Sequence, residues 1–277
     1  MRGRVLVVAG SDSGGGAGIQ ADIKAILAMD AYAMTAITAL TAQDTTGVHA
    51  VHAVPAAFLR LQMECVLADI GADVVKTGML GDAALIDTVA SVLVSHASRV
   101  PVVVDPVMVA KGGAVLLSDD AAAHMKRVLL PLAHLITPNL PEAELLCGMA
   151  IVDEAAMQAA TQVLRGMGVP AVLIKGGHLP GDTIVDVLAT AAGTEVFRSP
   201  RIVSRHTHGT GCTLASAIAA GLAQGMALRD AVARARGYVA AAILAAPGYG
   251  RGHGPLNHGV TLDPARIAGM RGGEAEG

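Results

Sequence analysis

The chain has 277 residues, of which 53% are hydrophobic, 16% are charged and only 2% are aromatic, and its formal net charge is −3. This length allows two small domains or one large α/β domain, and the composition favours one, because the hydrophobic fraction is sufficient for an extensive core. The weak negative charge and few aromatic residues argue against nucleic acid as a partner, and apolar runs shorter than about 18 residues argue against a membrane.

Strand-like apolar runs alternate with segments of helical periodicity along the chain. The runs cover residues 5–10, 33–41, 73–79, 100–108, 134–139 and 171–177. Helical patterns cover residues 55–71, 82–97, 154–168 and 213–225. Residues 183–190 and 194–203 predict an antiparallel pair near one edge of the sheet, and the tail 271–277 is expected to be disordered. Alternation of this kind predicts an α/β fold in which helices cover both faces of a mostly parallel sheet.

Glycines crowd the first predicted strand exit, between Gly10 and Gly18. Residues 16–21 match the GxGxxA dinucleotide pattern, which would suggest a nicotinamide-dependent oxidoreductase. The match is weak, because several residues separate the pattern from the strand whose end it should turn. A mobile flap over a small substrate is the preferred interpretation, and a flexible connection is the alternative.

Polar residues also follow later predicted strands. Asp105 and Glu142 could gather Mg²⁺ and nucleotide phosphates at the carboxyl ends of the sheet, and Lys175 would seek an anion there. Structural alternatives exist for both acidic residues. Asn139 and Glu142 have the spacing of a capping box, and Asp105 before Pro106 could form a turn.

The segment His208-Gly209-Thr210-Gly211-Cys212 leads directly into a helix of small residues. Its glycines let successive backbone N–H groups converge, and the helix directs its positive dipole end toward the same point. This construction favours an anion. A thiol in the first turn would have its thiolate stabilised, so Cys212 is a candidate base for group transfer. The alternative is a glycine-bearing turn before a core helix with a buried cysteine.

The cysteines are too few and too widely spaced for a disulfide framework or a CxxC metal site, so a reducing cytoplasm is expected. Cys65 and Cys147 are predicted to be packing residues. The pairs His49/His52 and His206/His208 have spacings that could hold zinc, but no third ligand is nearby in the sequence.

Seven motifs, in this order, resemble the hydroxymethylpyrimidine/phosphomethylpyrimidine kinases of thiamine biosynthesis, within the ribokinase superfamily. The resemblance extends from Val5 to His258, and the motifs are AGSDSGGGAGIQADIKA, TALTAQDTTGV, KTGML, DPVMVAKGG, LITPNLPEAELL, IKGGH and HGTGCTLASAIAAGL. It implies a ribokinase-like three-layer α/β/α sandwich with a mostly parallel central sheet. It also implies ATP as phosphoryl donor, Mg²⁺, a homodimer, and a single domain over residues 1–270. A monovalent cation is a further candidate cofactor.

The same resemblance implies a role for each matching position. Gln43 corresponds to the glutamine that binds the pyrimidine, with Gly10, Met79 and Val107 against the ring. Asp105 and Glu142 match the region that organises Mg²⁺ and phosphates. The nucleotide side comprises Lys175, Asn139 and Glu142, and the anion hole and base comprise Gly209, Thr210, Gly211 and Cys212.

The sequence departs from the family pattern at two places. Ser13-Gly14 stands where Pro-Ser is more common, and His206 stands where Asn is common. Neither position carries the chemistry. The rival activity is a pyridoxal or pyridoxine kinase, which Gln43 alone does not exclude. A non-catalytic vitamin-binding protein is a rival of another class, but such a protein needs neither a base nor metal carboxylates.

Overall fold

The computed structural model describes residues 1–109, 113 and 116–263, and the predicted tail 271–277 lies outside them. Within these residues, nine strands form one sheet in the order β3-β2-β1-β4-β5-β6-β7-β8-β9. Neighbours from β2 to β7 pair in parallel, whereas β3, β8 and β9 add antiparallel strands at the two edges. The strands are β1 (Arg4–Asp12), β2 (Tyr32–Asp44), β3 (Gly47–Ala53), β4 (Val74–Thr77), β5 (Val102–Val104), β6 (Leu135–Ile136), β7 (Ala171–Lys175), β8 (Thr183–Thr190) and β9 (Gly193–Pro200).

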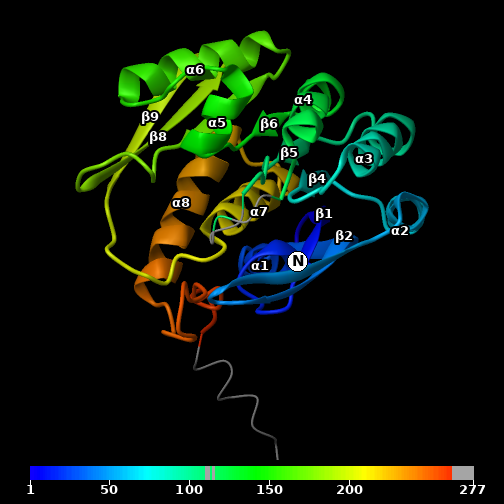
Figure 1. Cartoon of the computed structure of the whole chain (residues 1–277), viewed down its shortest axis with the longest axis horizontal. Coiled ribbons are helices and arrows are strands. Elements are labelled where there is room, and N and C mark those ends of the chain that lie inside the picture. The colour runs from blue at the N-terminus through cyan, green and yellow to red at the C-terminus, as the bar shows by residue number, and fades with distance from the viewer. Residues whose placement is uncertain (110–112, 114–115, 264–277) are drawn as a thin grey trace, which may run out of the picture.

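Helices cover both faces of the sheet, as Figure 1 shows. One face carries α2 (Ala56–Asp69), α3 (Ala83–His96), α4 (Asp119–Val128), α5 (Leu140–Cys147) and α6 (Glu154–Gly166). The other face carries α1 (Gly18–Ala28), α7 (Thr210–Ala223) and α8 (Leu228–Leu244). The result is the predicted three-layer α/β/α arrangement, with a mostly parallel sheet in the middle.

The two hydrophobic cores follow from the alternation of side chains along each strand. Val5 and Val7 of β1 point into the core beneath α1, α7 and α8, whereas Leu6 and Val8 point into the core beneath the other five helices. Because both faces are covered, all four side chains are fully buried. This explains why β1 appears in the sequence as a continuous apolar run rather than as an alternating pattern.

Small side chains compensate for the shortage of aromatic residues. Helix α7 consists largely of alanine, glycine and serine, and it packs closely against α8. A Cβ added to Gly221 would lie only 2.8 Å from the Cβ of Ala231, so the two helix backbones approach where neither carries a bulky group. Close approach of this kind yields a dense core without large rings.

The structure contains every strand and helix predicted from the periodicity, and it adds others. Helix α1 begins inside the glycine-rich segment, and β3 was absent from the predicted strands. Strand β3 is exposed along most of its length, so it has no buried face that a pattern could reveal. Cys65 was wrongly predicted to pack: it is exposed, as are Phe58 and Leu61, whereas Leu59 and Met63 form the buried face of α2.

None of the helices in the described part of the chain is both long enough and apolar enough to cross a membrane.

Candidate active site

The carboxyl end of β5 places Asp105 beside the end of β7. The carboxylate is 2% exposed and accepts hydrogen bonds from Lys175 Nζ at 2.8 Å and from Thr137 Oγ1 at 3.0 Å. A Cβ added to Gly211, in the first turn of α7, would lie 3.2 Å from Lys175 Nζ and 3.7 Å from Asp105 Oδ2. The fold therefore brings together an acidic, a basic and a helix-terminal residue from three distant parts of the sequence.

Lys175 keeps its charge despite its burial. Burial would lower the pKa of this ammonium group, but the carboxylates of Asp105 and Glu142 raise it above its ordinary value. The pKa of Asp105 moves in the opposite direction: burial would raise it, and the charges of Lys175 and Lys76 hold it below its usual range. Both groups are therefore ionised at neutral pH, and they form a charged pair at the carboxyl ends of the parallel strands.

Asn139 and Glu142 form the capping box that their spacing suggested. Asn139 Oδ1 accepts from the backbone N–H of Glu142 at 3.0 Å, and Glu142 Oε2 accepts from the backbone N–H of Asn139 at 2.8 Å. The same carboxyl group also faces Lys175 and Asp105, and burial raises its pKa to about 7. The structural interpretation of Glu142 is thus confirmed, and the position beside Lys175 also suits phosphate or metal binding.

The first turn of α7 supplies the backbone donors that an anion hole would need. Gly209 is its N-cap with φ of 81°, and an added Cβ would collide with the carbonyl oxygen of Gly16. Only glycine fits this position, for steric as well as conformational reasons. Gly211 and Cys212 follow in the first turn, where backbone N–H groups lack intrahelical acceptors. They are available to an anion next to Lys175.

Cys212 lies in the first helical turn, as predicted, but its thiol is not acidified. Burial raises its pKa to about 12, although the nearby charge of Lys76 and a hydrogen bond from the backbone of Gly18 act in the opposite direction. The expected stabilisation of a thiolate by the helix dipole is therefore outweighed by the loss of water around the sulfur. Without ligands the thiol is protonated at neutral pH.

The residues implied for the pyrimidine also lie at the carboxyl ends of the strands. Gly10 faces Met79, since a Cβ added to Gly10 would lie 2.5 Å from the methyl carbon of Met79. Val107 follows Asp105 and donates its backbone N–H to the Asp105 carbonyl at 2.8 Å. Gln43 stands beside a β-bulge of β2, and its Nε2 lies 3.3 Å from His208 Nε2. Gln43 is thereby linked to the segment that begins the anion hole.

The glycine-rich loop is organised by Asp12, which sequence reasoning missed. Its buried carboxylate accepts hydrogen bonds from the backbone N–H groups of Gly14, Gly16 and Ala17 and from His208 Nε2. Burial would raise the pKa of Asp12, but these hydrogen bonds hold it below its usual range. A dinucleotide phosphate would need the same N–H groups, so the GxGxxA match does not form a cofactor loop.

A second missed group lies behind the anion hole. Lys76 on β4 and Asp22 on α1 are fully buried and form an ion pair at 2.9 Å, and Ser216 Oγ of α7 donates to Asp22 at 2.6 Å. The charge of Lys76 is the main one lowering the pKa of Cys212. The sequence does contain a signal for this buried pair. Lys76 is a charged residue within an apolar strand, and Asp22 lies on the same helix face as Ile19 and Ile26.

The residues present suit magnesium only together with a phosphate ligand. Among residues 1–109, 113 and 116–263, no group of three or more histidine, cysteine or acidic side chains could hold a metal ion by itself. The zinc alternative is accordingly unsupported, and His208 pairs with Asp12 rather than with His206. Asp105 and Glu142 nevertheless fit Mg²⁺, which usually takes one or two carboxylates and completes its shell with phosphate and water.

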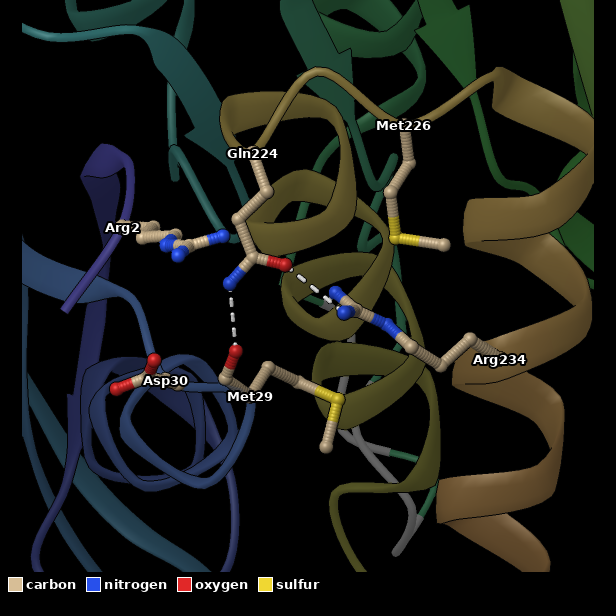
Figure 2. A pocket seen from close by; sticks show the side chains of 6 residues that line it. All are labelled: Arg2, Met29, Asp30, Gln224, Met226 and Arg234. Atoms are coloured by element: carbon tan, nitrogen blue, oxygen red, sulfur yellow. Dashed lines mark hydrogen bonds between the residues drawn. The ribbon is translucent and has the colours of Figure 1, made fainter.

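A pocket of about 460 Å³ lies at the opposite end of the strands, near the amino end of β1. Figure 2 shows Gln224 at its centre, donating to the carbonyl of Met29 at 2.7 Å and accepting from Arg234 Nη1 at 2.8 Å. The six lining residues, which also include Arg2, Asp30 and Met226, contain none of the predicted site residues. The candidate active site is therefore the polar region around Asp105, at the carboxyl ends of the strands, and not this pocket.

Comparison with known proteins finds relatives that match most of the chain. The chain is 54% identical over 265 residues to the thiamine biosynthesis bifunctional protein ThiED of Geobacter sulfurreducens, which covers 96% of this chain but 54% of that relative. The chain thus spans about half the length of that protein. It is 47% identical to the hydroxymethylpyrimidine/phosphomethylpyrimidine kinase of Streptomyces coelicolor, over 93% of this chain and 95% of the relative.

A solved structure gives the same fold. The ADP complex of Bacillus subtilis pyridoxal kinase matches with a TM-score of 0.88 and 36% identity, over 94% of this chain and 98% of that one. A family profile described as phosphomethylpyrimidine kinase matches residues 12–257, which include every predicted catalytic, metal and nucleotide residue. The chain belongs to the phosphomethylpyrimidine kinase family.

Proposed function

We propose that the chain phosphorylates 4-amino-5-hydroxymethyl-2-methylpyrimidine to its monophosphate and then to its diphosphate, with ATP as donor, in thiamine diphosphate biosynthesis. One observation carries the proposal: the first turn of α7 lies against the Asp105–Lys175 pair, and Gly10, Met79 and Gln43 lie at the same carboxyl ends of the strands. An anion hole thus stands beside a place for a small ring. Membership of the family supports the choice of substrate.

In this proposal the transferring phosphoryl group rests against the backbone N–H groups of Gly211 and Cys212. Lys175 supplies a fixed positive charge on the nucleotide side, held in place by its hydrogen bond to Asp105. Charge that develops on the transferring group is then met by donors already in position, which is the main contribution a protein makes to phosphoryl transfer. Cys212 would accept the proton of the attacking alcohol once its own thiol has released its proton to solvent.

Magnesium belongs to the same proposal. Asp105 and Glu142 would hold it together with the nucleotide phosphates, and it would neutralise charge on the phosphate oxygens. In this chain Thr137 and Lys175 fix Asp105, and the capping box fixes Glu142. Both carboxylates are therefore oriented before any ligand arrives. A monovalent cation is a further candidate.

Pyridoxal is the second candidate substrate, because the Bacillus subtilis structure with the same fold is a pyridoxal kinase. Its ring is a pyridine with a 3-hydroxyl group, whereas the pyrimidine carries an amino group next to a ring nitrogen. An amide such as Gln43 can donate to a ring nitrogen and accept from an amine. This complementarity favours the pyrimidine.

A cytoplasmic homodimer completes the proposal. Exposed apolar side chains occur on β2, β3 and α2, which are neighbouring elements, and they would be covered by a second copy. They are Tyr32, Leu40, Val51, Phe58 and Leu61. Analytical ultracentrifugation of the purified protein measures the oligomeric state directly.

Product analysis by mass spectrometry tests the activity. The purified protein is incubated with ATP, Mg²⁺ and either the pyrimidine alcohol or pyridoxal, and each is compared by kcat/KM. Formation of the pyrimidine diphosphate is the expected result. Preference for pyridoxal would transfer the assignment to the second candidate, and binding of the pyrimidine with no ATP turnover would indicate a vitamin-binding protein instead.

A further inference from the structure

His208 joins the two halves of the candidate site. Its Nε2 lies 2.9 Å from Asp12 Oδ2 and 3.3 Å from Gln43 Nε2. Its backbone continues directly into Gly209, the N-cap of α7. One imidazole nitrogen therefore contacts both the carboxylate that organises the glycine-rich loop and the amide proposed to bind the pyrimidine.

The contact with Asp12 determines where the imidazole proton lies. The pKa of Asp12 is held below its usual range, so its carboxylate is ionised and can only accept hydrogen bonds. His208 must therefore donate from Nε2, and its single N–H is shared in a three-centre hydrogen bond between Asp12 Oδ2 at 2.9 Å and the side-chain amide of Gln43 at 3.3 Å. A nitrogen that carries a proton has no lone pair with which to accept, so an amide N–H2 group placed against it would oppose one donor with another.

Rotating the side-chain amide of Gln43 by 180° removes this conflict. Amide oxygen and nitrogen are assigned from their hydrogen-bond partners, and here the partners require the oxygen to face His208. The nitrogen then faces Thr41 Oγ1, which lies 3.2 Å from the other end of the amide. Thr41 gives its single proton to the Ser11 carbonyl at 2.8 Å, so its oxygen is free to accept from the amide.

The backbone around Gln43 is fixed as well. Ser13 Oγ accepts from the backbone N–H of Gln43 and donates to its carbonyl, both at 2.8 Å. With the backbone held, the orientation of the side-chain amide is the remaining freedom. His208 and Thr41, at its two ends, determine it.

We propose that His208 is a positioning residue that holds the Gln43 carbonyl toward the imidazole and thereby selects rings with an amino group next to an unprotonated ring nitrogen. The proposal rests on the proposed function, in which Gln43 contacts the ring. After the contacts with His208 and Thr41, the amide keeps one lone pair and one N–H for a ligand. A 4-aminopyrimidine supplies the matching N–H and ring nitrogen.

The corresponding 4-oxo ring has the opposite pattern, because it presents a carbonyl next to a ring N–H. A Gln43 amide that is held in place would oppose it with like groups, whereas an amide that is free to rotate would accommodate it. Discrimination between the two rings therefore reports the orientation of the amide. Simple loosening of the loop would weaken both rings alike.

The experiment compares the 4-amino and 4-oxo pyrimidine alcohols as substrates of the wild type, His208→Phe and His208→Gln. The wild type should prefer the amino ring, and His208→Phe should reduce that preference by about tenfold or more, mainly through KM. His208→Gln keeps an N–H donor and should restore most of the preference. In a Gln43→Ala background, His208→Phe should leave the preference unchanged, because the residue acts through the amide.

Equal losses for both rings in His208→Phe, or the same loss of preference in the Gln43→Ala background, would overturn the proposal. If His208→Phe does not fold, Thr41→Val removes the partner at the other end of the amide and should also lower the preference. Thermal shifts with the two alcohols give the same comparison without turnover. A wild type that phosphorylates neither ring but still binds the amino ring selectively would count against the proposed function and leave the role of His208 intact.

Discussion

At the scale of the residue, Cys212 combines a helix start, a nearby cation and a dry environment. The first two favour a thiolate, and the third favours the neutral thiol by a larger margin, which leaves the pKa at about 12. A thiol of this kind can serve as a base only for the small fraction of enzyme in which it is ionised. Rates that depend on it should therefore rise with pH.

We predict that Cys212→Ala lowers kcat/KM for the pyrimidine alcohol by about a hundredfold or more, the usual size of a general-base contribution. The monophosphate should lose less than about tenfold, because its second ionisation lies near pH 6 and its attacking oxygen needs no base. In the wild type, kcat/KM for the alcohol should increase from pH 7 to 9 while that for the monophosphate stays level. Equal losses for the two acceptors would contradict the role of the thiol.

Two arginines separated by one residue on α8, and so on different sides of the helix, provide a second test at this scale. Arg234 borders the pocket of Figure 2, and its Nε and Nη2 are buried without hydrogen-bond partners. Arg236 instead donates to Asp186 at 2.7 Å, and both of these side chains are largely buried. We expect Arg234→Met to raise the free energy of unfolding by about 1 kcal/mol, because it removes unpaired polar atoms.

The matched variant Arg236→Met should lower the free energy of unfolding by about 3 kcal/mol, because it leaves the Asp186 carboxylate buried without its partner. Urea denaturation of both variants beside the wild type measures the difference. A loss of similar size in Arg234→Met would mean that its stem packing outweighs the unpaired nitrogens.

The residues of the candidate site were predictable where a motif marked them. Asp105, Lys175 and the anion-hole segment each stand at a strand exit or helix start, and the structure brings them together. Asp12 was not predicted, because its role depends on backbone N–H groups that converge only once the loop has folded. The acidity of Cys212 depends on burial, which local sequence does not reveal.

At the scale of the element, the Lys76–Asp22 pair connects β4 to α1, and Ser216 connects the same carboxylate to α7. This pair lies between the sheet and the helices that position the anion hole. A buried ion pair stabilises little by comparison with apolar packing, but loss of one partner is costly.

We predict that Lys76→Met lowers the free energy of unfolding by about 3–5 kcal/mol, the usual cost of leaving a charge buried and unpaired. The double variant Lys76→Met/Asp22→Leu should lose less than the single variant, because neither charge is then left alone. Chemical denaturation of the single and double variants measures this coupling. Losses that simply add would show that the two side chains act independently.

A helix or strand could be predicted from the sequence when its buried and exposed faces differ clearly in hydrophobicity. Strand β7 and helix α3 bury a clear set of aliphatic residues, and their periodicity indicates both. Helix α8 was not predicted, because half of its buried residues are alanine and its arginines interrupt the pattern. The exposed strand β3 had no pattern to find, and its pairing with β2 depends on the edge that β2 offers.

At the scale of the whole molecule, the segment after α8 returns to the site. His258 is 5% exposed, and its Nε2 lies 2.9 Å from Thr213 Oγ1, next to Cys212. Burial, helped by the charge of Lys24, lowers its pKa to about 4 from 6.5. The folded protein therefore holds this imidazole neutral where the unfolded chain would protonate it.

The folded protein should therefore become less stable as the pH is lowered. Between pH 6.5 and about 4 the unfolded state binds one more proton at His258 than the folded state, so the free energy of unfolding should decline by up to about 1.4 kcal/mol per pH unit as the pH falls. His258→Gln should reduce that slope and leave the slope above pH 7 unchanged. Denaturation curves at a series of pH values measure it, and identical slopes in the two proteins would contradict the assignment.

The same returning segment affects the order in which the molecule can be completed. His253 donates its backbone N–H to the carbonyl of Thr45 at 2.8 Å, and Gly254 accepts from the backbone N–H of His208 at 3.2 Å. The last part of the described chain thus braces the turn beside Gln43 against the anion-hole segment. During synthesis, the half of the candidate site encoded in the first 45 residues is therefore braced only after residue 254 has left the ribosome.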